Sequence, residues 1–349
     1  MSRKALSYLA ICTVIAVVAA IWAVHQEWSR WDSNQYGTKL FPELASKLDD
    51  VARVRLRHGN TTITLDRTAK GWAVHEADDY PAHANAIQEL LYALSESRRL
   101  EPKTQEAKKY AKLELDDPTQ PKSKAKRIDV FDKNGNTLAS LILGKDNILL
   151  QTISDGGAYV RLPGQKQTWL ASGNLVAGDD FKDWLDNPIM NVPRQRIARA
   201  VLIHPNGDRM VVVKSPKDPG KFILEGMASD EKLISQYYPS DIVRVFEKFE
   251  IDQAQRADKV KFPPKATIKG AYHTIEGMTI NFELTMIDGK GWMRFDSITT
   301  DGTPSAGLEA DRKAIEANTK GWAFLLPEYE SIHLKKTRAE TVEKVKPQS

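Results

Sequence analysis

The sequence predicts an α+β protein, with an N-terminal transmembrane helix followed by two tandem copies of a mainly antiparallel β-sheet plus helix unit. A long run without charged residues predicts the membrane helix. Short segments of alternating apolar and polar residues between turn residues predict antiparallel strands, and their order occurs twice. The predicted parts are a cytoplasmic N-terminus (1–4), a transmembrane signal anchor (5–24), a juxtamembrane connector (25–44), a first α+β repeat (45–177), a linker (178–196), a second α+β repeat (197–334) and a charged tail (335–349).

The apolar run covers residues 5–24 and follows directly after Arg3 and Lys4. A helix of this length spans roughly 30 Å, which is the hydrocarbon thickness of a bilayer. Because basic residues stay on the cytoplasmic side, we expect the N-terminus in the cytoplasm and the residues after about 25 in the periplasm of a bacterial inner membrane. A cleaved secretory signal is the alternative, but the length of the run and the poor small-x-small sites near its end favour a retained anchor.

Charge and cysteine content exclude several classes of function. The chain has 50 Lys and Arg against 46 Asp and Glu, which is far from the basic excess that nucleic-acid binding requires. We interpret the one basic cluster, at residues 122–127, as a solvated linker, with contact to anionic lipid headgroups as the alternative. Cys12 is the only cysteine and lies in the apolar run, so the exported part has no disulfide and no thiolate metal site.

The first repeat is expected to fold as strands around one helix. Tyr80-Pro81 leads into the helix, which carries Ile87, Leu90, Leu91 and Leu94 on one stripe. Asn134-Gly135 is a strong two-residue hairpin turn, and Pro163-Gly164 marks a second turn. The predicted strands are residues 51–56, 62–65, 71–74, 127–132, 137–143, 158–162 and 168–171.

The second repeat follows the same order. Tyr238-Pro239 opens its helix, which carries Ile242, Val245, Phe246 and Phe249 on one face. After residue 335 the chain becomes charged and polar, which predicts a frayed tail. The predicted strands are residues 200–203, 210–213, 221–224, 266–272, 278–286, 292–295 and 320–326.

The ordered set of motifs resembles the bacterial domain of unknown function 4340 family over most of residues 39–330. That domain also forms part of the auxiliary protein associated with gliding-motility ABC transporters. The resemblance implies a membrane-tethered extracytoplasmic domain that works beside an ABC permease and ATPase, and it brings no established catalytic residues. The motifs that carry it are Lys39-Leu40-Phe41-Pro42, Gly71-Trp72, Tyr80-Pro81, Glu101-Pro102-Lys103, residues 110–115 followed by Asp116-Asp117-Pro118, Trp184-Leu185-Asp186, Val192-Pro193 and Arg196-Ile197.

Motifs for catalysis and metal binding are weak or missing. The sequence has no G-x-x-x-x-G-K-[ST], no G-x-G-x-x-G and no G-x-S-x-G, which argues against nucleotide binding and against an α/β-hydrolase. His75 and His83 flank Asp78-Asp79, which is a metal-like grouping or, as we favour, a polar loop before a helix. The pairs Asp78-Asp79, Asp116-Asp117 and Asp179-Asp180 sit where turns and helix caps favour Asp. We therefore predict no cofactor, no metal and no enzymatic activity.

Aromatic residues supply the candidate interface or ligand groove, namely Trp72, Tyr80, Trp184 and Tyr238. For the tryptophans, we favour core packing of the two sheets over a place in a ligand cleft. The first functional hypothesis is a non-enzymatic single-pass membrane protein, an accessory or scaffold subunit of an ABC-type transport system, with permease and ATPase subunits as partners. A ligand-binding module for a peptide, glycan or lipid is the alternative, and an unrecognised hydrolase is the least favoured.

Overall fold

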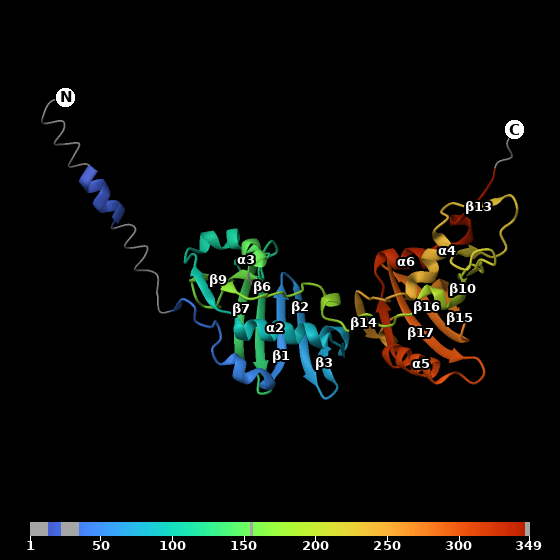
Figure 1. The fold of residues 1–349 in the computed structure, drawn as a ribbon, viewed down its shortest axis with the longest axis horizontal. Helices are drawn as coiled ribbons and strands as arrows, with labels where there is room; N and C mark the ends of the chain where they lie inside the picture. The colour runs from blue at the N-terminus through green and yellow to red at the C-terminus, as the bar shows by residue number, and fades with distance from the viewer. Residues whose placement is uncertain (1–12, 22–34, 154–155, 346–349) are drawn as a thin grey trace, which may run out of the picture. The chain divides into compact units, whose positions relative to one another are not determined.

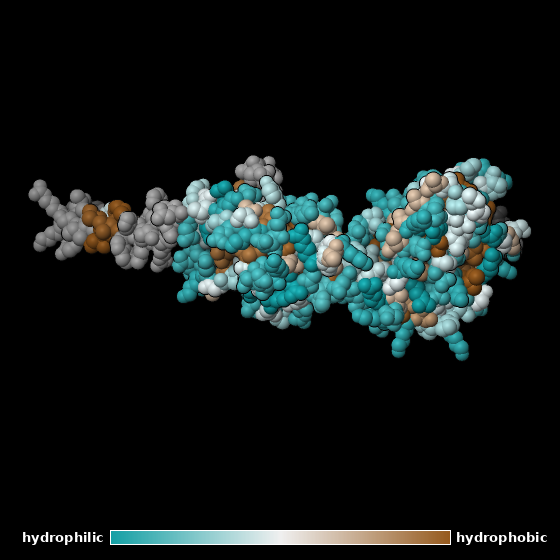
Figure 2. Space-filling model, turned by 90° about the horizontal axis from the view of Figure 1, so that it is seen from below, coloured by the Kyte–Doolittle hydropathy of each residue, from teal (hydrophilic) through white to brown (hydrophobic). Residues whose placement is uncertain are grey.

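The computed structural model describes residues 13–21, 35–153 and 156–345 (Figure 1). The chain forms two compact units. The first combines the described residues up to Thr62 with Ile87–Ala177, and the second combines Ile63–Ala86 with the described residues from Gly178 onward. On the face seen in Figure 2, hydrophilic residues predominate in both units, and small groups of apolar residues lie among the hydrophilic ones.

The predicted membrane span falls mostly on residues outside the described ranges. Of residues 5–24, only 13–21 are described, and these are helical and exposed. Across the described part of the chain, no helix is both long enough and apolar enough to cross a membrane. The cytoplasmic N-terminus (1–4) and the connector up to residue 34 also lie outside the described residues.

The first sheet has nine strands in the order β4-β3-β2-β1-β6-β7-β8-β9-β5. The predicted Asn134-Gly135 turn joins β6 to β7, and Gly135 takes the positive φ (82°) that this turn favours. The strands are β1 (Val51–His58), β2 (Thr61–Thr68), β3 (Gly71–Val74), β4 (Tyr80–Pro81), β5 (Arg99–Pro102), β6 (Lys126–Asp132), β7 (Thr137–Asp146), β8 (Gly157–Arg161) and β9 (Thr168–Ser172).

Helix α2 (Ala84–Glu96) lies across one face of this sheet (Figure 1). It buries the predicted stripe of Ile87, Leu90, Leu91 and Leu94. Side chains alternate along each strand, so Val54 and Leu56 belong to the core, while their neighbours in sequence belong to the opposite face. A long segment between β5 and β6, with the 3₁₀ helix Ala107–Leu113, and the short helix α3 (Ile148–Ile153) complete this part of the fold.

The second sheet has eight strands in the order β12-β11-β10-β15-β16-β17-β18-β14. If the first sheet is read from β3 and the second from β12, their strands follow the same order. In each sheet the first strand after the helix, β5 after α2 and β14 after α4, is the edge strand at the other end. The predicted α+β class with antiparallel sheets is confirmed. The strands are β10 (Ile197–Ile203), β11 (Arg209–Lys214), β12 (Phe222–Leu224), β14 (Gln253–Arg256), β15 (Thr267–Thr274), β16 (Met278–Ile287), β17 (Lys290–Thr300) and β18 (Trp322–Leu325).

The helices of the second repeat differ from the prediction. Helix α4 (Tyr238–Val243) is short and continues as the 3₁₀ helix Arg244–Phe246, and the chain turns at Lys248, whose φ is 56°. Helix α5 (Ala306–Thr319), between β17 and β18, was not predicted. Helix α6 (Glu328–Lys335) follows β18.

The expectation of a frayed C-terminal tail is corrected in part. The 3₁₀ helix Arg338–Glu340 begins with a capping box from Thr337, and β19 (Val342–Lys344) pairs with β13 (Glu231–Leu233). An ion pair between Arg338 and Glu231 (2.6 Å) also holds this segment to the β13 region. The tail is therefore ordered through backbone pairing despite its polar sequence, and residues 346–349 lie outside the described ranges.

Candidate ligand cleft

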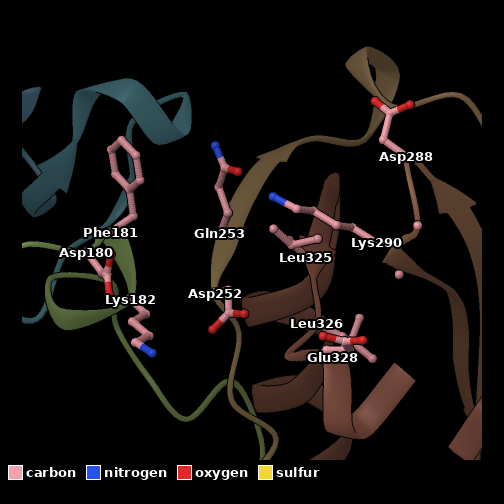
Figure 3. Close-up of a pocket in the computed structure, with 12 residues that line it drawn as sticks. Asp180, Phe181, Lys182, Asp252, Gln253, Asp288, Lys290, Leu325, Leu326 and Glu328 are labelled. Carbon is pink, nitrogen blue, oxygen red and sulfur yellow. The ribbon is translucent and has the colours of Figure 1, made fainter. Parts of the chain in front are cut away.

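The second unit contains a cleft of about 590 Å³ (Figure 3). Its wall comes from four separate segments of the chain, so the cleft exists only in the folded protein. The lining residues are Asp180, Phe181, Lys182, Asp252, Gln253, Asp288, Gly289, Lys290, Gly291, Leu325, Leu326 and Glu328.

Backbone hydrogen bonds hold the strands of the cleft together. The N–H of Asp252 donates to the carbonyl of Leu325 (2.9 Å), and Gln253 pairs with Leu325 in the β14–β18 ladder. The N–H of Leu326 donates to the carbonyl of Gly291 (2.9 Å), which joins the end of β18 to β17. Three strands thus fix the positions of the side chains that project from this edge of the sheet.

The β16–β17 turn requires residues that tolerate positive φ. Asp288 and Gly289 have φ values of 51° and 79°, as a two-residue type I′ turn demands. Gly291 has a different role, since a Cβ atom there would lie 2.5 Å from the Cβ of Ser331. The missing side chain lets helix α6 pack closely on β17 and places Glu328, in the first turn of α6, at the cleft.

The opposite wall is the short 3₁₀ helix Phe181–Asp183. Asp180 and Asp183 form a capping box at its start. The buried indole of Trp184 donates to the carbonyl of Gly178 (3.1 Å), and the N–H of Leu185 donates to the carbonyl of Phe181 (3.1 Å). These contacts fix the loop that presents Phe181 and Lys182 to the cleft.

The lining combines apolar surface with an excess of acidic groups. Leu325 and Leu326 provide apolar surface, while four carboxylates (Asp180, Asp252, Asp288, Glu328) accompany the two ammonium groups of Lys182 and Lys290. In Figure 3 the Lys290 side chain extends toward β14, whereas the Asp288 carboxylate points away from the other labelled groups. Among the described residues, no group of three or more His, Cys, Asp or Glu side chains could hold a metal ion. The excess of carboxylates in the lining suits a ligand that carries a positive charge.

The four aromatic residues proposed from the sequence do not line this cleft. Trp72 is half-buried in β3. Tyr80 is 3 % exposed and lies edge-on to Trp322, with 4.8 Å between ring centroids. Trp184 is 2 % exposed and supports the cleft loop, and the buried Tyr238 donates its hydroxyl to the carbonyl of His333 (2.8 Å). Their part in ligand binding stays a prediction.

Three of the histidines and paired carboxylates noted in the sequence, His75, Asp78 and Asp117, make contacts that belong to turns or link strands. The His75 ring lies 3.4 Å from the Asp79 carboxylate in an exposed position. Within the second unit, Asp78 accepts a hydrogen bond from the N–H of Arg256 (2.9 Å) and pairs with Lys259. Asp117 accepts from the N–H and hydroxyl of Thr119, as a turn residue does.

Most cleft residues could not be identified from the sequence. Asp180 belongs to one of the Asp pairs noted in the sequence, but that pattern does not indicate a ligand site. Asp252 and Glu328 carry no local signal, because the strand edge and helix start that place them together are far apart in sequence.

The comparisons with known proteins give one result. A family model described as a domain of unknown function (DUF4340) matches residues 72–266, a range that includes the 3₁₀ helix and β14 side of the cleft. No curated protein and no solved structure matches the chain. Since the match covers more than half of the sequence, the chain belongs to the family of the domain of unknown function DUF4340.

Proposed function

We propose that this protein is a non-enzymatic, single-pass membrane protein whose two folded units lie outside the cytoplasm. In this proposal it is an accessory or scaffold subunit of an ABC-type transport system. The observation that carries the proposal is the charge-free run at residues 5–24, which follows Arg3 and Lys4 and precedes both folded units. The transporter enters the proposal as a partner through the resemblance to a domain that also forms part of the auxiliary protein of gliding-motility ABC transporters.

Site-directed labelling tests the topology. Ser229 is exposed in the second unit, so Ser229→Cys should react with a membrane-impermeant maleimide once the outer membrane is permeabilised. Ser2→Cys, in the predicted cytoplasmic N-terminus, is the matched control and should react only after lysis. Equal labelling of both variants in unlysed cells, or protection of both, would contradict the proposed topology.

A crosslinked pull-down of the tagged full-length chain tests the partner. We expect an ABC permease and its ATPase to be enriched together, as identified by mass spectrometry. The accessory-subunit proposal is rejected if neither is enriched relative to an unrelated single-pass protein with a tag of the same kind.

A second candidate function is binding of a soluble ligand, which the cleft favours. Its volume lies within the roughly 300–1,000 Å³ that is usual for small-molecule sites. Three carboxylates (Asp180, Asp252 and Glu328) beside two ammonium groups favour a ligand with basic groups, such as a lysine-containing peptide, while the Asp288 carboxylate points away.

Two matched aspartate variants test the cleft. Asp252→Asn removes a carboxylate at the β14 wall, and Asp288→Asn removes one that points away. With trilysine as probe, titration calorimetry should show binding that Asp252→Asn weakens by about tenfold and that Asp288→Asn changes by less than about twofold. Equal effects of the two variants would indicate general electrostatic attraction and not a defined site.

A further inference from the structure

Three arginines form a row across the first sheet. The strand register pairs Arg57 on β1 with Arg127 on β6, then Arg127 with Ile142 on β7, and Ile142 with Arg161 on β8. Directly paired residues of antiparallel strands project from the same face. All four residues line a cavity of about 220 Å³ within the first unit, and the Asp117-Pro118-Thr119 loop and the Pro163-Gly164 turn line it too.

Like charges at paired positions repel, so the row needs compensation. Asp129 provides part of it from a nearly buried position. It lies 3.3 Å from Nη2 of Arg57 and 2.9 Å from Nε of Arg127, and it also accepts a hydrogen bond from the hydroxyl of Ser140. One carboxylate thus serves two guanidinium groups.

The third arginine is positioned by neutral groups. Nε and Nη2 of Arg161 donate to the carbonyl of Leu115 (3.3 and 3.2 Å), and its guanidinium carbon lies 4.7 Å from the centroid of the Tyr110 ring. Hydrogen bonds from Thr119 hold the pKa of Asp117 below its usual range, and the charges of Arg161 and Arg127 act in the same direction. Two carboxylates therefore accompany three guanidinium groups at this cavity.

Not every donor of the row has a hydrogen-bond partner among the described residues. Nε of Arg57 is buried and has no hydrogen-bond partner in the part of the chain that the structure describes. Arg127 uses its Nε in the contact with Asp129, and it lines the cavity.

The second sheet shows how such a row is neutralised internally. The two sheets can be aligned residue by residue, because the first strand of each has a register shift near its start. The shift lies between Val51 and Arg53 in β1 and between Ile197 and Arg199 in β10, so Arg53 corresponds to Arg199. In that alignment the row of Arg127, Ile142 and Arg161 corresponds to Lys269, Glu283 and Arg294.

The alignment places a carboxylate where the first sheet has an apolar residue. Glu283 accepts two hydrogen bonds from Arg294 (2.9 and 2.6 Å), whereas Ile142 offers Arg161 no charge. The aromatic contact is retained, since Arg294 lies 4.5 Å from the Phe262 ring centroid. At the position of Arg161 the first sheet therefore has the guanidinium group but lacks the paired carboxylate that Glu283 provides to Arg294 in the second sheet.

We propose that the cavity between Arg57, Arg127 and Arg161 binds a phosphate group, either as free phosphate or as the headgroup of an anionic phospholipid. Guanidinium groups form paired, charge-assisted hydrogen bonds with phosphate oxygens. Three guanidinium groups around a small cavity match a tetrahedral anion with several oxygens better than they match a carboxylate with two. This site is formed by the first unit and does not depend on the proposed transporter role.

The test is titration calorimetry of the full-length protein in detergent with inorganic phosphate, at constant ionic strength because charge contacts are screened by salt. We expect Arg57→Gln to weaken binding by about tenfold or more. Arg55→Gln is the matched control, because Arg55 lies on the same strand and face, does not line the cavity, and has its guanidinium carbon 5.2 Å from the Phe131 ring centroid. It should change the affinity by less than about twofold.

The variant Ile142→Glu gives an independent test, since it copies the carboxylate of the second sheet into the row. It should abolish phosphate binding while circular dichroism shows the native content of strand, and Ile142→Leu should bind as the wild type does. The proposal is overturned if phosphate binds no better than chloride, or if Arg55→Gln weakens binding as much as Arg57→Gln.

Short-chain lipids distinguish the two sources of the phosphate group. If dihexanoyl phosphatidic acid binds at least about tenfold more tightly than inorganic phosphate, and dihexanoyl phosphatidylcholine does not, the ligand is an anionic lipid headgroup. Similar affinities for phosphatidic acid and inorganic phosphate would assign the site to free phosphate.

Discussion

The two sheets share one strand order but fill their interiors with different residues. In the first repeat, the helix α2 contributes aliphatic side chains, among them Leu91. In the second, Phe246 occupies the matching position of the helical stripe and meets the rings of Phe249, Tyr272 and Phe282, at centroid distances of 5.3, 4.6 and 5.4 Å. Among the described residues, ring–ring contacts lie in the second unit. Alternation and turns therefore fix the topology, while the packing of each core is free to diverge.

The same divergence occurs within the strand ladders. Ile128 on β6 pairs with Leu141 on β7, whereas the matching pair in the second sheet is Gly270 with Phe282. A Cβ atom on Gly270 would lie 2.0 Å from the Phe282 ring. The second sheet therefore combines a missing side chain with a large one, and the first uses two of intermediate size. The summed side-chain volume of the pair is therefore similar in the two sheets, although the size of the side chain at each position differs.

The largest expected effect comes from truncating the aromatic core. Phe246→Ala should lower the free energy of unfolding by about 3–5 kcal/mol, because Phe246 is fully buried among rings that cannot collapse into the space. Leu91→Ala, the matched variant in α2, should cost about 2–5 kcal/mol. Urea unfolding of the full-length protein, followed by circular dichroism, measures both. A loss below about 1.5 kcal/mol for Phe246→Ala would show that the aromatic cluster is not essential to its core.

A smaller effect is expected from adding volume to the ladder. Gly270→Ala should destabilise the protein by about 1–3 kcal/mol, because the Phe282 ring must leave its position over the glycine. The double variant Gly270→Ala, Phe282→Leu copies Leu141 of the first sheet at the second position. In the same urea experiment it should recover part of the free energy of unfolding that Gly270→Ala loses. If the double variant is less stable than the sum of the single changes, the two sheets do not conserve volume at this pair.

Strong local signals made much of the fold predictable. The Asn134-Gly135 turn and the stripe of α2 depend on neighbouring residues alone, and both were correctly predicted. Helix α5 was missed because its sequence has a weak apolar face, on which only Leu308, Ile315 and Thr319 are buried. Ion pairs of Arg312 with Glu309 and Glu316, one turn apart, stabilise it instead.

The sites were harder to predict than the fold, because each one depends on strand register. Residues 122–127 were interpreted as a solvated linker, and the alternative was a lipid contact. In the structure Lys122 and Lys124 are exposed, while Arg127 lies in β6 and joins Arg57 and Arg161. No spacing in the sequence connects these three arginines, since the sheet order that brings them together pairs distant segments.

The smallest expected effect concerns helix α6, which the first repeat lacks. Glu330 on α6 is half-buried, and its Oε2 atom has no hydrogen-bond partner among the described residues. Burial raises the pKa of Glu330 to about 7, with Asp241 and Glu250 acting in the same direction and Arg244 opposing them. Between pH 4.5 and 7 the folded state therefore keeps a proton that the unfolded state releases, so this group destabilises the fold as the pH rises.

Glu330→Gln removes this dependence and should raise the free energy of unfolding at pH 8 by about 1–2 kcal/mol, since partial exposure screens the charge. At pH 4 the variant and the wild type should have nearly equal stability, because the carboxyl is protonated in both states. If the free energies of unfolding of Glu330→Gln and the wild type differ by the same amount at pH 4 and pH 8, the carboxyl of Glu330 reaches water when it ionises. Helix α6 then adds no pH dependence to the stability of the fold that the two repeats share.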